Sequence, residues 1–199
     1  MNRPWCMAVV PCLLALAGLV PNAARATEAA RDPGPEDILV ELDSRPGEPS
    51  RFVTVAVLPA PPERVWEIID RCADYKANFI GITESVELAR AENSRRCKVT
   101  VSMPFPFADL TSVSEVTNTL TPGKAWKKEW ELLEGDYKHN SGRWTLTPYG
   151  PSGTRTLVVY ELMAEPNVRI PMFIINAVQK ITMPMMINKL RGVLTAPGS

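Results

Sequence analysis

The stretch PMFIINAVQKITMPMMINKLRGVL, residues 171–194, is the longest helical pattern in the chain and decides the fold. Pro171 suits a helix start, and Pro184 predicts a kink inside the helix. Most surface helices have one apolar face, but this one has two. The first face is Ile170, Ile174, Ala177, Val178, Ile181 and Met185, and the second is Met172, Ile175, Met183, Met186, Ile187 and Leu190. We expect the first face to close the interior.

Before this helix the chain predicts two strands, then two helices. Residues 38–42 and 52–58 are β-rich and are separated by turn residues at 45–47, which predicts an antiparallel pair. Pro62 suits the first position of an amphipathic helix on which Val65, Ile68, Ile69 and Cys72 recur at helical spacing. Residues 77–82 predict a short second helix that Gly81 ends.

After Gly81 the apolar period changes to two, which predicts a run of strands and therefore an α+β protein with a mainly antiparallel sheet. Each strand has one apolar row that should face the core. The rows are Cys97, Val99, Val101 and Met103; Trp126, Trp130 and Leu132; Trp144 and Leu146; and Thr156, Val158, Tyr160 and Leu162. Inward aromatic residues, together with the methionines of the last helix, favour an adaptable cavity over a plain core.

The N-terminus predicts export. Arg3 precedes an apolar run, residues 8–20, and Ala24-Arg25-Ala26 resembles a signal-peptidase site. The run is short for a membrane span, so an anchor is the weaker alternative. We therefore expect a signal peptide at residues 1–26, a flexible linker at 27–36, a folded domain at 37–194 and a periplasmic location. The 22 basic and 22 acidic residues cancel, so no nucleic-acid partner is expected.

Cys72 and Cys97 are the two cysteines that would remain after cleavage. An even pair in an oxidising compartment can form a disulfide. Two buried, unlinked thiols are the alternative, because free cysteine is often a small core residue. The sequence leaves both possibilities open.

Several local motifs, in their order, resemble the helix-grip fold of the START-like and Bet v 1-like superfamily, which includes polyketide cyclase-type domains. The motifs are APPERVW at 60–66, DY at 74–75, FIGI at 79–82, GDYK at 135–138, GRWTL at 142–146 and GTR at 153–155 with Tyr160. The segment PFPFAD at 104–109 resembles the Pro-aromatic-Pro loop of START lipid-transfer domains. There an arginine usually follows, whereas Leu110 and Thr111 stand here.

The resemblance implies a curved antiparallel sheet wrapped around the last helix, with a cavity for a lipid, isoprenoid or quinone-like molecule between them. We expect carriage or presentation of that ligand. A cyclase- or dehydratase-type enzyme and a protein-interaction module are the alternatives. The residues expected to contact the ligand are Phe79, Val99, Val101, Phe105, Phe107, Trp130, Trp144, Tyr160, Ile174, Val178, Ile181 and Met185, with the Tyr160 hydroxyl as a polar anchor.

Few residues suggest chemistry. His139 lies in a polar stretch and is expected in a solvated loop. The spacing of histidine and cysteine residues does not predict a metal site, and no glycine-rich loop predicts a cofactor. Lys128 and Glu84 each stand two residues from apolar residues of their strands that are expected to face inward. They are therefore expected to point to the inner face, and either could orient the polar end of a ligand. Either could instead extend to solvent at the edge of the sheet, which is the favoured alternative.

The second face of the last helix needs a cover. The N-terminal strands, a partner subunit or transient contact with a membrane could supply it.

Overall fold

The computed structural model describes residues 33–45, 49–168 and 170–196, which belong to one compact unit. The predicted signal peptide and residues 27–32 of the predicted linker lie outside these ranges, as do residues 46 and 47 of the predicted turn. Within the described ranges, no helix combines the length and hydropathy needed to cross a membrane.

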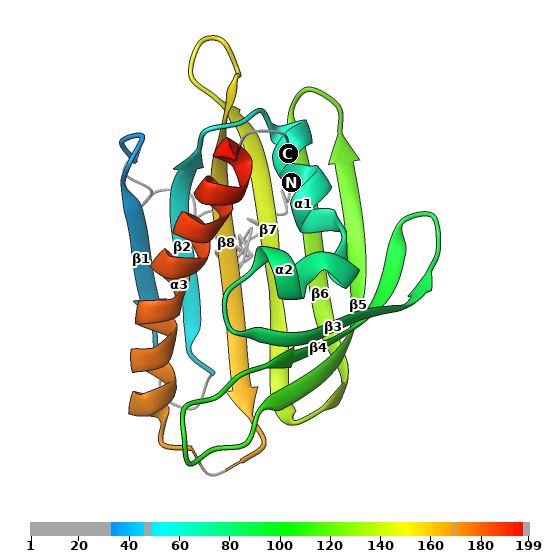
Figure 1. Ribbon diagram of the computed structural model, residues 1–199, viewed down its shortest axis with the longest axis vertical. Helices are drawn as coiled ribbons and strands as arrows, with labels where there is room; N and C mark the ends of the chain where they lie inside the picture. The colour runs from blue at the N-terminus through cyan, green and yellow to red at the C-terminus, as the bar shows by residue number, and fades with distance from the viewer. Residues whose placement is uncertain (1–32, 46–48, 169, 197–199) are drawn as a thin grey trace, which may run out of the picture. The chain divides into compact units, whose positions relative to one another are not determined.

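Eight strands form one antiparallel sheet in the order β1-β2-β8-β7-β6-β5-β4-β3. Figure 1 shows the helices on one side of the sheet, with α3 lying across β1, β2 and β8. The α+β helix-grip prediction is confirmed. The elements are β1 (Ile38–Asp43), β2 (Arg51–Leu58), α1 (Pro62–Asp70), a 3-10 helix (Cys72–Asp74), α2 (Tyr75–Asn78), β3 (Ile82–Arg90), β4 (Ser94–Val101), β5 (Leu110–Thr121), β6 (Ala125–Gly135), β7 (Tyr137–Tyr149), β8 (Arg155–Pro166) and α3 (Met172–Thr195).

The predicted inner rows face the helices. In β8 the members of the row Thr156, Val158, Tyr160 and Leu162 are all buried, and in β7 Trp144 and Leu146 are buried. These rows join Val65, Ile68 and Ile69 of α1 in one hydrophobic core. Each fully buried large apolar side chain contributes roughly 1.5–3 kcal/mol of transfer free energy. The period of two therefore identified the correct face of these strands.

The second helix differs from the prediction. It spans Tyr75–Asn78, and residues 79–82 leave it, because Phe79 has extended backbone angles and Ile82 begins β3. Gly81 adopts a left-handed φ of 76° in the connection, where its carbonyl accepts a hydrogen bond from the Ser102 backbone N–H. The apolar spacing that suggested a helix arises because these residues line the interior from a turn.

The last helix packs with the face opposite to the predicted one. Its buried residues belong to the second face, namely Ile175, Met183, Met186, Ile187 and Leu190. In the first face, Ile181 is 63% exposed and Met185 is 46% exposed. The prediction that this face closes the interior is wrong. Both faces are apolar, and periodicity alone cannot say which one meets the sheet.

The end of the predicted linker is bound to the domain. The Arg191 guanidinium on α3 donates hydrogen bonds to the carbonyl oxygens of Pro35, Glu36 and Asp37 at 3.1–3.2 Å, and to that of Val57. Arg191 thus joins α3 to β2 and to the segment before β1. These contacts reach residues 35 and 36 of the predicted linker.

The 3-10 helix is covalently joined to the sheet. Cys72 and Cys97 form a disulfide with a Cα–Cα distance of 6.2 Å. Both cysteines are buried and pack with Val116 of β5. Of the two alternatives that the sequence left open, the structure has the bonded one.

We expect Cys72→Ala/Cys97→Ala to destabilise the domain, because the open loop regains conformational freedom in the unfolded chain. The chain-entropy estimate for a loop of this length is roughly 3 kcal/mol. Denaturant unfolding of the oxidised wild type and the variant measures the difference. Equal free energies of unfolding would show that the bond is absent in solution or contributes nothing.

Candidate functional site

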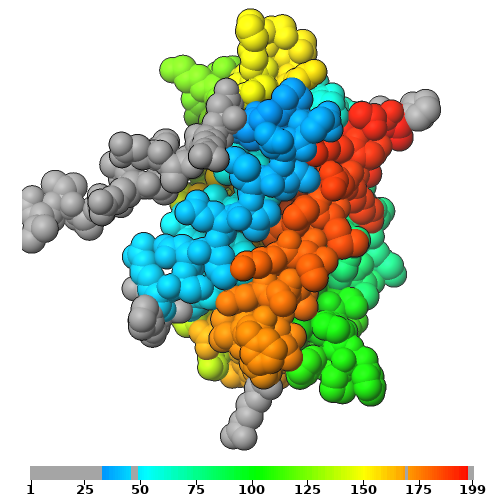
Figure 2. Space-filling model, turned by 90° about the vertical axis from the view of Figure 1, so that its left-hand side faces the viewer, coloured from blue at the N-terminus to red at the C-terminus, as the bar shows by residue number. Residues whose placement is uncertain are grey.

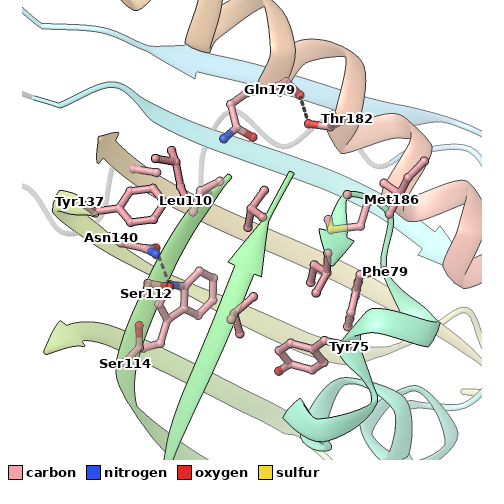
Figure 3. Close-up of a pocket in the computed structure, with 18 of the residues that line it drawn as sticks. Tyr75, Phe79, Leu110, Ser112, Ser114, Tyr137, Asn140, Gln179, Thr182 and Met186 are labelled. Atoms are coloured by element: carbon pink, nitrogen blue, oxygen red, sulfur yellow. Dashed lines mark hydrogen bonds between the residues drawn. The ribbon is translucent and has the colours of Figure 1, made fainter. Parts of the chain in front are cut away.

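A cavity of about 250 Å³ lies between α2, the first half of α3 and the inner face of the sheet. Figure 3 shows side chains from all three directions pointing into it. The volume is just below the usual range for small-molecule sites, roughly 300–1,000 Å³. Of the predicted ligand contacts, seven line this cavity: Phe79, Val99, Val101, Trp130, Trp144, Tyr160 and Val178.

Five predicted contacts do not line the cavity. Phe105 is 97% exposed in the loop between β4 and β5, and Phe107 of the same loop is half-buried. Ile174, Ile181 and Met185 lie on the part of the first face of α3 that is turned away from the cavity, whereas Val178 of the same face lines it. Two errors therefore explain the five differences: the loop was expected to contact the ligand, and the first face of α3 was expected to close the interior.

Other lining residues were missed. On β5 the row that faces the cavity is Leu110, Ser112, Ser114 and Val116. The residues between them are also small or polar, so the strand has no alternation of apolar and polar residues that would identify its inner face. Met183 and Met186 of α3 line the cavity from the second face. Tyr75, Tyr137, Asn140, Gln179 and Thr182 were also missed. Asn140 could have been predicted, because it is four residues before Trp144 on β7 and alternate residues of a strand point to the same face.

Aromatic rings form a continuous chain along the cavity. Trp130 stacks on Tyr160 with centroids 5.9 Å apart, and Tyr160 lies 4.2 Å from Trp144. Phe79 continues the chain at 5.9 Å from Trp144, and Tyr75 meets Phe79 edge to face at 4.8 Å. Aromatic pairs at these separations add stability beyond their buried area. The chain supplies a rigid apolar wall that reaches from β6 to α2.

A glycine makes room for one of these rings. A Cβ atom at Gly142 would clash with the Trp130 ring and with the carbonyl oxygen of Glu161. The ring therefore lies directly over the β7 backbone, and its Nε1 donates a hydrogen bond of 3.1 Å to Asn140 Oδ1. Glycine at this position lets the indole lie flat on the sheet.

Lys128 is buried, with 2% of its surface exposed. Its Nζ donates hydrogen bonds to the carbonyl oxygens of Ile69 at 2.9 Å and Asp70 at 3.0 Å, at the C-terminal end of α1. It also lies 5.1 Å from the centre of the Tyr75 ring. The prediction that Lys128 extends to solvent is wrong, because the helix end supplies acceptors inside the core. Glu84 does lie at the surface, 3.3 Å from Lys98 Nζ.

Several charged groups surround Lys128. Arg95 forms an ion pair with Asp70, and Arg90 bonds to Glu87 at 2.6 Å and 2.9 Å. Burial lowers the pKa of Lys128 to about 7, although the Asp70 carboxylate opposes that shift. The hydrogen bond from Arg90 holds the pKa of Glu87 below its usual value. The cluster lies where α1 meets the sheet.

The tyrosines of the cavity stay protonated. Burial raises the pKa of Tyr160 and of Tyr75 far above the usual value, and it raises that of Tyr137 to about 12. Their hydroxyl groups are therefore neutral at physiological pH. His139 is exposed on β7, where it stands opposite Glu165 in the strand register, rather than in the predicted loop, and it does not line the cavity.

Comparison with solved structures finds the same fold. A STAR-related lipid transfer protein from Xanthomonas axonopodis superposes with a TM-score of 0.68 at 20% identity, covering 84% of this chain and 97% of that one. Human StAR-related lipid transfer protein 5 gives 0.63 at 10% identity, covering 78% and 86%. The Zhui aromatase/cyclase from Streptomyces gives 0.57 at 16% identity, covering 72% and 92%.

Sequence comparison agrees. Residues 58–191 match the family model described as polyketide cyclase / dehydrase and lipid transport. No curated protein matches the chain.

The lowered pKa of Lys128 makes stability depend on pH. In the unfolded chain a lysine titrates near 10.4, so between about pH 7 and pH 10 the unfolded state binds more protons than the folded state. The free energy of unfolding should therefore rise with pH over this window.

Lys128→Met should flatten that rise, because it removes the group that titrates differently in the two states. Urea unfolding at several pH values measures the slope for both proteins, with Lys127→Met, at the half-buried neighbouring position of the same strand, as a matched control. An identical slope in wild type and Lys128→Met would contradict the assignment.

Proposed function

Because the chain belongs to the polyketide cyclase/dehydrase and lipid transport family, we propose that it binds a hydrophobic small molecule in the cavity beneath α3. The observation that carries the proposal is the aromatic chain from Trp130 to Tyr75, which lines one interior space together with Met183 and Met186. Such a surface suits a lipid, isoprenoid or quinone-like molecule. Burial of that molecule supplies affinity at about 25 cal/mol per Å² before ordering costs.

The character of the lining supports binding rather than catalysis. Among the described residues, Lys128 is the one side chain with a formal charge that lines the cavity. Its Nζ already donates to two carbonyl oxygens of α1. A group engaged in this way holds the helix end to the sheet, so the cavity offers shape and apolar area more than reactive groups.

The proposal includes export to the periplasm, where the protein carries or presents its ligand across an aqueous space. Arg3, the apolar run at residues 8–20 and Ala24-Arg25-Ala26 support a cleaved signal peptide. The bond between Cys72 and Cys97 is consistent with an oxidising compartment.

Filling the cavity should abolish ligand binding. Ala164 lines the cavity from β8, and Ala164→Trp places an indole in that space. We expect at least a tenfold weaker affinity for an apolar fluorescent dye, since a site of about 250 Å³ has little room to spare. Fluorescence titration measures the affinity.

The matched control is Ala177→Trp, which makes the same substitution at an exposed position of α3. It should bind the dye as the wild type does. Equal weakening by both variants would show that the dye binds elsewhere.

We also propose that the outer face of α3 touches a membrane transiently while the ligand enters or leaves. Figure 2 shows this helix, in orange and red, running along the surface beside β1. Phe173 is 73% exposed and Ile181 is 63% exposed on it, and Met185 is exposed as well. Apolar side chains of this kind on a helix can enter the headgroup region of a bilayer.

Phe173→Glu and Ile181→Glu should each reduce recovery of the protein with floated liposomes by about tenfold, because a charged side chain opposes insertion. Leu133→Glu is the control, since Leu133 is 50% exposed on β6. Unchanged flotation of the two helix variants would rule out this face as the contact.

A further inference from the structure

One wall of the cavity is polar. Ser112 and Ser114 reach it from β5, and Tyr137 and Asn140 reach it from β7. Figure 3 shows these four side chains together on one side, with Tyr75, Phe79 and Met186 on the other. We call Ser112, Ser114, Tyr137 and Asn140 the polar wall.

The polar wall has unused hydrogen-bonding capacity. Ser112, Ser114 and Tyr137 line the cavity, and within the part of the chain that the structure describes their hydroxyl groups make no hydrogen bond to another residue. Asn140 Oδ1 accepts from Trp130, which leaves the amide NH₂ group unpaired. These groups are not among the fully buried unpaired atoms of the described residues, so they open onto the cavity. A ligand that displaces solvent from the cavity must therefore supply their hydrogen-bond partners.

The polar wall also lacks charge. Serine and asparagine are neutral, and Tyr137 remains protonated because burial and the nearby Asp136 raise its pKa to about 12. Lys128 lies 5.1 Å from the Tyr75 ring, on the opposite side of the cavity, and its Nζ is engaged with α1. The nearest acid, Asp136, accepts a hydrogen bond from the Thr111 backbone N–H at 2.7 Å. A buried carboxylate or phosphate would find no positive partner at this wall, and burial of an unpaired charge is costly.

We propose that the polar wall binds the uncharged, oxygen-bearing end of an amphipathic ligand, such as a hydroxyl, ester or carbonyl group. The apolar part of the ligand then lies along the aromatic chain toward Phe79 and Tyr75. This inference rests on the proposed function and narrows it from hydrophobic molecules in general to neutral amphiphiles. The hydroxyl groups of the wall can donate or accept a hydrogen bond, so the wall suits a ligand end that carries both a hydroxyl oxygen and a carbonyl oxygen.

Three probes with a ten-carbon chain, counting the carbonyl carbon, and different ends test the inference: monodecanoylglycerol, decanoate and decyltrimethylammonium. At a pH of about 8 decanoate is ionised, and displacement of a bound apolar dye reports the affinity of each probe. We expect monodecanoylglycerol to bind at least tenfold more tightly than either ion. The protein is the oxidised chain with Cys72 and Cys97 bonded.

Two variants connect this preference to the wall. Ser112→Ala/Ser114→Ala and, separately, Tyr137→Phe remove hydroxyl groups with little change in shape. Each should weaken monodecanoylglycerol several-fold while leaving the affinity for the dye unchanged. Ser141→Ala is the matched control, because Ser141 lies on β7 and does not line the cavity.

The outcomes separate the two levels of proposal. If the dye binds but decanoate or the ammonium probe displaces it as well as monodecanoylglycerol does, the inference is overturned and the proposed function stands. The inference also fails if both hydroxyl-removing variants bind monodecanoylglycerol as the wild type does. A folded protein that binds neither dye nor probes contradicts the proposed function itself.

Discussion

The register between β6, β7 and β8 is the constraint on which the interior depends. Trp144 of β7 pairs with Tyr160 of β8 on one side and with Lys128 of β6 on the other. A slip of one residue would turn all three side chains to the opposite face of the sheet. The aromatic chain would then disappear, the cavity would lose its floor, and the end of α1 would lose a hydrogen-bond donor. Ligand binding and core stability therefore rely on the same pairing.

Lys128 shows how the sheet holds α1. The carbonyl groups at the C-terminal end of a helix lack partners within the helix, and Arg71, the residue after α1, has an extended backbone in place of a glycine cap. Lys128 and Arg95 supply the missing donors from β6 and β4. A positive side chain there also complements the helix dipole. These contacts fix α1, while the disulfide fixes the 3-10 helix that follows, and α2 is thereby held against the cavity.

Sequence patterns predicted most of the fold, because strands and helices with one buried face have clear periods. The inner rows of β7 and β8 and the start of α1 at Pro62 follow from that rule. Prediction failed where both alternatives had the same pattern. The faces of α3 are equally apolar, and Phe79 and Ile82 have helical spacing although Phe79 has left α2 and Ile82 begins β3. Ser112 and Ser114 look like surface residues, and only tertiary contacts show that they face the cavity.

The candidate site combines a rigid aromatic surface, adaptable methionines and an uncharged polar wall around one cavity. This combination accounts for a binding protein that selects its ligand by apolar shape and by a few neutral hydrogen bonds. The most direct measurement is mass spectrometry of an organic extract of the protein purified from its own cells. The account predicts one neutral amphipathic molecule recovered in near-stoichiometric amount with the chain. Recovery of charged ligands alone, or of no small molecule from a protein whose interior proves densely packed, would contradict it.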